Sequence, residues 1–343
     1  MRNPATSFWN RATALALLGT LLLGWPLQAQ TLRERIQERL AARAAQRAAS
    51  APTTNANLQE YVLEHGGLQR RYLLYVPARL SASQAVSLVL AFHGGGGHAE
   101  YMANDARYGL QSMAEREGFA VAFPNGFSRL PGGKFATWNA GGCCGDARDR
   151  GVDDVGFARA VVADVQRHRA IDRNRIFATG MSNGGMMSHR LACDAADLFR
   201  AVASVAGTDA TTTCQPSRAV AVLHIHAKDD THVLYNGGAG PDAFRDASKV
   251  MDFVSVPDTI ARWVARNQCA ATPQRVLDKP GARCDIYPSC RDDAAVELCT
   301  TDSGGHSWPG ASLVRKGKPD ANQALDASRV IGAFFTQVGN SRP

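Results

Sequence analysis

The sequence predicts an α/β protein with a mostly parallel central sheet and helices on both faces. Apolar runs of strand length alternate with stretches whose apolar residues recur at helical spacing. The run Val86–Phe92 is almost continuously apolar, as in a strand buried on both faces. A length of 343 residues with 45% hydrophobic content suits one large domain of this class and is too short for two.

The N-terminal part differs in composition from the rest of the chain. Residues 1–29 combine Arg2 and Arg11 with an apolar run that ends on a small residue, which is typical of a secretory signal peptide. The run is too short for a membrane span, although an uncleaved anchor is the alternative interpretation. Residues 30–57 predict a short basic helix and a flexible tether, and residues 58–343 form the expected folded domain.

The net charge of +7 does not indicate a nucleic-acid-binding face. Residues 1–50 hold seven arginines and two glutamates, so the rest of the chain carries only about +2. The eight cysteines are an even set, which in an exported chain predicts disulfides rather than a metal site. No pair has the spacing of a zinc knuckle, so we expect no metal.

The first predicted elements form a hairpin and two buried strands. Residues 61–64 and 69–76 flank a His-Gly-Gly turn and predict the hairpin. The strand Val86–Phe92 is followed by a helix over 103–117 and by a second apolar strand over 118–124.

The following elements continue the alternation of strands and helices. Apolar residues over 155–165 mark a helix with one apolar face, for which Asp153 or Asp154 is the expected N-cap. Short apolar runs then predict strands over 175–179, Ala201–Val205, 220–225 and Val296–Thr301. The last two helices are expected over 259–265 and 327–338, and the cysteine-rich segment 269–299 between them as short strands held by disulfides.

A candidate nucleophile follows the strand over 175–179. Gly180-Met181-Ser182-Asn183-Gly184 fits Gly-x-Ser-x-Gly between a strand and a helix. A serine on such a bend takes strained backbone angles, which requires neighbours without a Cβ, and Gly180 and Gly184 supply that room. The strain would expose the Ser182 hydroxyl at a helix N-terminus, where negative charge is favoured. A glycine-rich turn without chemical meaning is the alternative.

A serine nucleophile needs a base, and in this arrangement the order along the chain is serine, acid, histidine. His306 lies in a glycine-rich loop after the strand Val296–Thr301, which makes it the best candidate. A satisfied surface histidine is the alternative.

The acid is expected in the loop after the strand over 220–225, which contains Asp229 and Asp230. The residues alone do not separate these two, because either carboxylate could reach a histidine ring. His226 and His232 flank them and are rival bases, although a base so close in sequence to its own acid rarely has the right geometry.

The oxyanion of the transition state needs two amide donors. We expect one from Asn183, the residue after the nucleophile, and one from Gly95 in the loop His93-Gly94-Gly95-Gly96-Gly97. Trp138 and Trp308 could line a substrate site for an acyl or aryl group, or could equally belong to the core.

Seven blocks in order resemble the polyhydroxybutyrate depolymerase and feruloyl esterase family of secreted α/β-hydrolases. They are HGGGG at 93, the run at 138–145, VDDVGFARA at 152, GMSNGGMM at 180, the stretch 226–238, VPDTIARW at 256 and GGHSWPG at 304. The resemblance covers roughly residues 60–340. Ala227 replaces the glycine usual at that position, a mild departure.

The resemblance implies the α/β-hydrolase fold, with 58–343 as its catalytic domain and the disulfide-held segment before the catalytic histidine. It implies Asp230 rather than Asp229 as the acid, and no cofactor or metal. Family members that digest solid polyester often carry a separate polymer-binding module; none follows in this sequence, which favours oligomers, amorphous chains or small esters as substrates.

Among the cysteines, the positions favour three pairs and leave a fourth open. The hypotheses are Cys193–Cys214, Cys269–Cys290, Cys284–Cys299, and Cys143 with Cys144 or with an outside partner.

The expected function is that of a secreted or periplasmic serine esterase that forms an acyl-enzyme, most similar to a depolymerase of poly- or oligo-3-hydroxybutyrate. The alternatives are a feruloyl or acetyl esterase acting on plant polysaccharide, a β-diketone hydrolase of oxidised polymer, and a catalytically idle hydrolase fold used for binding. The expected partner is an ester substrate, small or polymeric, with no nucleic acid and no membrane span after cleavage of the signal.

Overall fold

The computed structural model describes residues 57–243, 248 and 250–341. The predicted signal peptide, and the tether up to residue 56, lie outside the described residues. Within the described part of the chain, none of the helices combines the length and the apolar character that spanning a bilayer requires.

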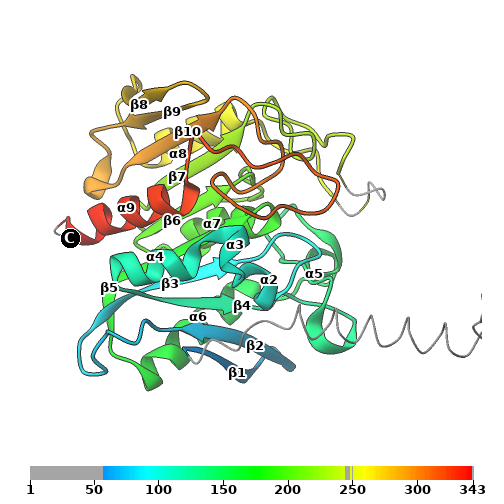
Figure 1. Ribbon diagram of the computed structural model, residues 1–343, viewed down its shortest axis with the longest axis vertical. Helices are drawn as coiled ribbons and strands as arrows, with labels where there is room; N and C mark the ends of the chain where they lie inside the picture. The colour runs from blue at the N-terminus through cyan, green and yellow to red at the C-terminus, as the bar shows by residue number, and fades with distance from the viewer. Residues whose placement is uncertain (1–56, 244–247, 249, 342–343) are drawn as a thin grey trace, which may run out of the picture. The chain divides into compact units, whose positions relative to one another are not determined.

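Ten strands form one sheet in the order β1-β2-β4-β3-β5-β6-β7-β10-β9-β8 (Figure 1). The strands are β1 (Leu58–His65), β2 (Leu68–Tyr75), β3 (Val86–Phe92), β4 (Phe119–Pro124), β5 (Ile171–Met181), β6 (Ala201–Val205), β7 (Ala221–Ala227), β8 (Gln274–Lys279), β9 (Ala282–Tyr287) and β10 (Val296–Thr301). The six central strands, from β4 to β10, run parallel, and the pairs at both edges are antiparallel. This is the α/β-hydrolase topology that the sequence predicted.

Helices cover both faces of the sheet (Figure 1). One face packs against α2 (Ala99–Met102), α3 (Asp105–Tyr108), α4 (Leu110–Glu117) and α9 (Ala327–Asn340). The other packs against α6 (Asp154–His168), α7 (Asn183–Asp194) and α8 (Val256–Arg266), while the short α5 (Gly145–Asp149) lies in a connection. Successive residues of β3 belong to opposite core layers and all are buried, which confirms the prediction of a strand covered on both sides.

The helix expected over 103–117 is wrong in its extent. Two short helices, α3 and α4, replace it, because Gly109 takes a left-handed φ of 57° between them. The Asp105 carboxylate accepts hydrogen bonds from the amides of Gln111 and Ser112, and so supplies partners for the new helix start. At α6 the sequence left two N-caps open, and Asp153 is the cap, since it accepts from the Gly156 amide.

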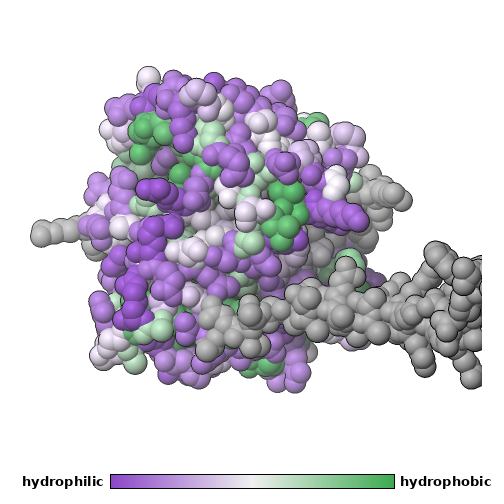
Figure 2. Space-filling model, viewed as in Figure 1, coloured by the Kyte–Doolittle hydropathy of each residue, from purple (hydrophilic) through white to green (hydrophobic). Residues whose placement is uncertain are grey.

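All four proposed disulfides are present, including the bond between the adjacent Cys143 and Cys144. The cysteine-rich segment contains the antiparallel pair β8–β9 before β10, as expected of short strands held by disulfides. The surface view in Figure 2 is mainly hydrophilic with small apolar patches, because most large apolar side chains lie in the two core layers.

Candidate active site

Ser182 lies on the sharp bend between β5 and α7, with φ 57° and ψ −122°. A Cβ on Gly180 would collide with the backbone of Gly184, and a Cβ on Gly184 would collide with the carbonyl of Phe92. Only glycine therefore fits at both positions, as the sequence predicted. The first intrahelical hydrogen bond of α7 runs from the Met186 amide to the Ser182 carbonyl, so the first-turn amides point toward the space beside the serine.

The other candidate residues follow strands of the same parallel set. Asp230 follows β7 and His306 follows β10, and β5, β6, β7 and β10 are consecutive neighbours in the sheet. The carboxyl ends of parallel strands meet at one edge of a sheet. The loops that carry Ser182, Asp230 and His306 therefore lie along the same edge.

Asp230 and His306 form a direct contact. The Nδ1 of His306 lies 2.8 Å from Oδ2 of Asp230, while Oδ1 accepts hydrogen bonds from the amides of His232 at 2.7 Å and Val233 at 3.0 Å. Asp230 is only 2% exposed. Burial would raise its pKa, but the charge of His306 and the hydrogen bonds from His226 and His306 outweigh burial and hold the pKa well below its ordinary value. The carboxylate is therefore ionised and fixed against the imidazole.

Within the described residues, no hydrogen bond joins the Ser182 hydroxyl to His306. The structure thus brings acid and histidine together and places the serine at the same sheet edge without closing the last contact. In ligand-free hydrolases this contact is often long and tightens when substrate binds.

Asp229, the other candidate acid, takes a different position. Its carboxylate accepts hydrogen bonds from the amides of Gly304 at 3.2 Å and Gly305 at 2.8 Å. These are the two residues before His306, so Asp229 holds the backbone of the loop while Asp230 holds the ring.

The loop His93–Gly97 lies beside the nucleophile, since a Cβ on Gly94 would lie 3.5 Å from the Ser182 Cβ. The amides of Gly96 and Gly97 are used by the carbonyls of Ala136 and Gly94. In contrast, the Gly95 amide donates to none of the described groups. Gly95 and Asn183, the predicted donors, thus retain amides that a ligand could engage.

The His93 ring fixes the shape of this loop. Its Nε2 accepts from the Gly126 amide at 3.0 Å, so Nδ1 carries the proton and donates to the Gly94 carbonyl at 2.8 Å. Burial lowers the pKa of His93 to about 4, which keeps the ring neutral.

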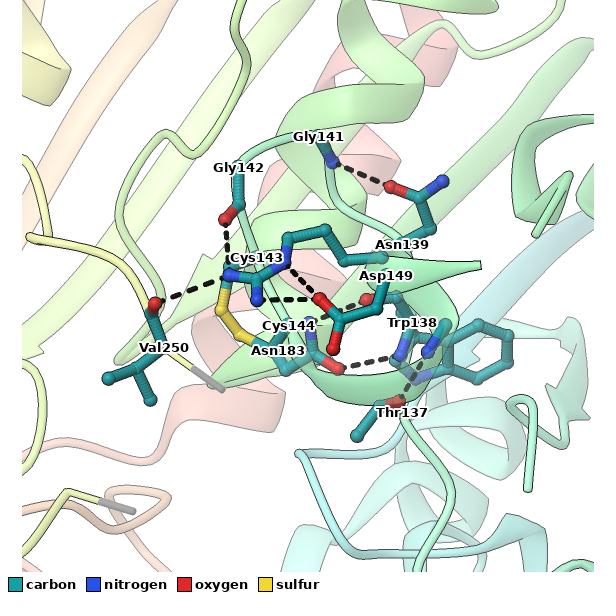
Figure 3. The surroundings of a disulfide bond; sticks show 12 residues. Thr137, Trp138, Asn139, Gly141, Gly142, Cys143, Cys144, Asp149, Asn183 and Val250 are labelled. Carbon is teal, nitrogen blue, oxygen red and sulfur yellow. Dashed lines mark hydrogen bonds and ion pairs between the residues drawn. A yellow bond between two sulfur atoms is a disulfide. The ribbon is translucent and has the colours of Figure 1, made fainter. Parts of the chain in front are cut away.

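Trp138 connects the two sides of the candidate oxyanion site. Its indole donates to the His93 carbonyl at 2.9 Å. The side-chain amide of Asn183 bonds the Trp138 backbone twice, at 2.7 Å to the amide and 3.0 Å to the carbonyl, as Figure 3 shows beside the Cys143–Cys144 disulfide. Trp138 is therefore hydrogen-bonded both to the glycine loop, through His93, and to the start of α7, through Asn183.

The two tryptophans do not offer the substrate wall that we considered. Trp138 is 0% and Trp308 is 3% exposed, and the Trp308 indole donates to the Ser328 hydroxyl. A side chain with no accessible surface presents none to a ligand in this conformation, so burial favours the core interpretation for both.

The rival bases lie near the acid in other roles. His226 is 1% exposed, with its Nε2 at 3.3 Å from Oδ2 of Asp230. His232 stacks on the His306 ring with centroids 4.4 Å apart, and burial lowers its pKa to about 4. Sequence reasoning missed the positioning contacts of Asp229 and His232, although their place in the acid loop was the available signal.

A metal site is not indicated in the described part of the chain. The cluster of possible ligand atoms found there consists of Cys284, Glu297 and Cys299, and its two sulfurs are joined in a disulfide. Disulfide sulfurs carry no thiolate charge to bind an ion.

Comparison with known proteins identifies the family of the chain. The family model described as "Esterase PHB depolymerase" matches residues 70–257. Feruloyl esterase B of Piromyces equi is 30% identical over 69% of this chain and 42% of its own length. Putative esterase NocK of Nocardia uniformis subsp. tsuyamanensis is 28% identical over 76% of this chain and 77% of its own.

Probable feruloyl esterase C of Aspergillus clavatus is 33% identical over 50% of this chain and 58% of its own length. The chain thus spans about half the length of two of these three relatives. Because the family model covers more than half of the chain, the chain belongs to the esterase PHB depolymerase family.

Proposed function

We propose that the protein is a serine carboxylic ester hydrolase with Ser182 as nucleophile, His306 as base and Asp230 as the orienting acid. The observation that carries the proposal is the 2.8 Å contact between His306 and Asp230 at the sheet edge where Ser182 occupies a strained bend. Membership of an esterase family supports it. An idle binding fold would be expected to lack one of the three side chains, and the sequence retains all three.

In the proposed mechanism, Nε2 of His306 removes the proton of the Ser182 hydroxyl as the oxygen attacks the ester carbonyl. The amides of Asn183 and Gly95 donate to the oxyanion that forms. His306 then passes the proton to the leaving alcohol, and an acyl-enzyme remains. A water molecule, deprotonated by the same imidazole, attacks the acyl carbon and releases the acid.

The ionised Asp230 stabilises the imidazolium that forms in both steps. It accepts from Nδ1 and so keeps Nε2 directed toward the reacting atoms. The two backbone hydrogen bonds to its Oδ1 prevent the carboxylate from turning away as the charge on His306 changes.

Two ester classes are candidates for the substrate. The family description names polyhydroxybutyrate depolymerases, which favours oligomers or amorphous chains of 3-hydroxybutyrate. Two of the relatives are named as feruloyl esterases, which favours aromatic esters of plant polysaccharide instead. Initial rates on oligo-3-hydroxybutyrate and on methyl ferulate, measured side by side, distinguish the two classes.

The proposed site of action is outside the cytoplasm, either in the periplasm or beyond the cell. Four disulfides stabilise proteins in an oxidising compartment, and residues 1–29 have the pattern of a signal peptide. N-terminal sequencing of the exported protein should begin close to residue 30.

Replacement of the nucleophile tests the mechanism. Ser182→Ala should lower kcat for p-nitrophenyl butyrate by about 10⁵-fold while leaving the melting temperature nearly unchanged. A fluorophosphonate should label the wild-type protein at Ser182 and leave the variant unlabelled. Turnover close to wild type, or an unlabelled wild-type serine, would contradict the proposal and favour a binding function.

A further inference from the structure

A line of buried rings leads from α8 through α7 to the candidate acid on the loop after β7. Its members are Trp263, His189, His224 and His226, with exposures of 0%, 0%, 0% and 1%. The proposed catalytic mechanism uses none of them. Three buried histidines in one row need an explanation, because each ring must find partners for two nitrogens.

The rings are joined end to end by hydrogen-bond distances. Nε1 of Trp263 lies 2.9 Å from Nδ1 of His189, and Nε2 of His189 lies 3.3 Å from Nδ1 of His224. Nε2 of His224 lies 3.1 Å from Nδ1 of His226. Nε2 of His226 then lies 2.9 Å from the Val233 carbonyl and 3.3 Å from Oδ2 of Asp230.

The Trp263 end sets the positions of the protons. An indole nitrogen can only donate, so Nδ1 of His189 must accept, and the proton of a neutral His189 lies on Nε2. The same reasoning passes along the row, so that His224 and His226 also carry their protons on Nε2.

The opposite end demands the same arrangement independently. The Nε2 of His226 faces two acceptors, a carbonyl and a carboxylate oxygen, and must therefore be protonated. Because an obligate donor and an obligate acceptor terminate the row, one set of tautomers satisfies every contact.

Burial keeps the first two histidines of the row, His189 and His224, neutral. Burial lowers the pKa of His189 to about 4 and lowers the pKa of His224 well below its ordinary value. At the α8 end, the negative charge of Asp209 raises the pKa of His189 and the positive charge of Arg266 lowers it, both by less than burial does. At the other end the titratable neighbours are the Asp230 carboxylate and, across it, the His306 ring.

We propose that His226, held in one tautomer by this row, is a positioning residue that keeps the Asp230 carboxylate oriented toward His306. The inference rests on the proposed role of Asp230. Oδ1 of Asp230 is held by two backbone amides, whereas Oδ2 contacts only His306 and His226 among the described side chains. The Nε2–H of His226 is thus shared between the Val233 carbonyl and the carboxylate oxygen that contacts the imidazole.

The tautomers can be read directly from the wild-type protein. In ¹⁵N-labelled protein at neutral pH, His189, His224 and His226 should each show a protonated Nε2 and a bare Nδ1. A proton on Nδ1 of any of the three would overturn the proposal. This readout needs no activity and stands even if Ser182 proves dispensable.

Kinetics test the effect on the acid. His226→Phe removes the donor and should lower kcat about tenfold with little change in KM. The acid limb of the pH–rate profile should move to higher pH, because a carboxylate that loses a donor favours the protonated form of His306 more strongly. His226→Gln, whose amide nitrogen can donate in place of Nε2, should recover most of kcat and the original limb.

A control separates positioning from loss of stability. Tyr72→Phe removes a buried hydrogen bond to Asp164 in the same core layer, away from the site, and should lower the melting temperature without changing kcat or the pH profile. Equal losses of kcat in the Phe and Gln variants at position 226, or no loss in either, would contradict the proposal. The triad itself is judged separately, by Ser182→Ala.

Discussion

Replacing Asp229 should expose how the histidine loop is held. The carboxylate of Asp229 accepts hydrogen bonds from the amides of Gly304 and Gly305. Asp229→Ala therefore leaves both amides without their protein acceptor. The Asp230–His306 contact does not involve this side chain. The change therefore loosens the backbone that carries the imidazole without removing the acid that orients it.

The size of the effect follows from the two contacts. A hydrogen bond to a charged group contributes about 1.5–3 kcal/mol when buried, and the exposed position of Asp229 puts each bond near or below the lower limit because water replaces it. A total of about 1.5 kcal/mol corresponds to roughly a tenfold smaller population of the ordered loop. Since the proposed mechanism uses His306 in every step, kcat should fall by about that factor.

The assay compares the two neighbouring aspartates on p-nitrophenyl butyrate. Asp229→Ala should lose kcat about tenfold, whereas Asp230→Ala should lose about 10⁴-fold, as expected when the orienting acid of a triad is removed. Asp229→Asn keeps one acceptor oxygen and should fall between wild type and alanine. If Asp229→Ala lost as much as Asp230→Ala, or if the order were reversed, the assignment of roles to the two carboxylates would be refuted.

Two further changes test the oxyanion support and a buried acid. Trp138→Phe deletes the indole that donates to the His93 carbonyl, and it should lower kcat about five- to tenfold with KM nearly constant. Tyr72→Phe, measured in the same assay, is the control. An equal kcat in the two variants would exclude a role for the indole. Burial raises the pKa of Glu297 from 4.5 to about 7, so the unfolded chain releases this proton at lower pH than the folded protein does. The free energy of unfolding should therefore fall by about 3 kcal/mol as pH rises from about 4 to about 8. In urea unfolding measurements, Glu297→Gln should not show this fall. The same pH dependence in the variant would contradict the assignment of the fall to Glu297.

The parts that sequence predicted well are those that local chemistry determines. The bend at Ser182 follows from the glycines at 180 and 184, whose missing side chains the structure requires. The strand Val86–Phe92 could be predicted as doubly covered because its apolar run has no polar face. The alternation of strands and helices predicted a mostly parallel sheet with its site at the carboxyl ends of the strands, and the observed strand order places the loops of Asp230 and His306 at that edge.

The parts that sequence left open depend on contacts between distant residues. Asp229 and Asp230 are adjacent carboxylates with equal reach, and only the path of the loop at 302–306 decides which one contacts the ring. The continuous helix over 103–117 was wrong because Gly109 adopts a left-handed conformation, whose use at that position depends on how α4 packs on α9. Trp138 gave no sign of its burial, since composition does not distinguish a core indole from a substrate wall.

The helix α7 connects two parts of the candidate site, the Ser182 bend at its start and the row of rings through His189. Ser182 precedes its first residue, and His189, on the same helix, lies seven residues further along, about 10 Å by the rise of an α-helix. Through the row of rings His189 connects to His226 and so to Asp230. The helix α7 is therefore linked to both the proposed nucleophile and the proposed acid. A shift of α7 would move Ser182 and disturb the support of Asp230 together, so substitutions at 189 should change kcat even though the side chain does not touch the candidate site.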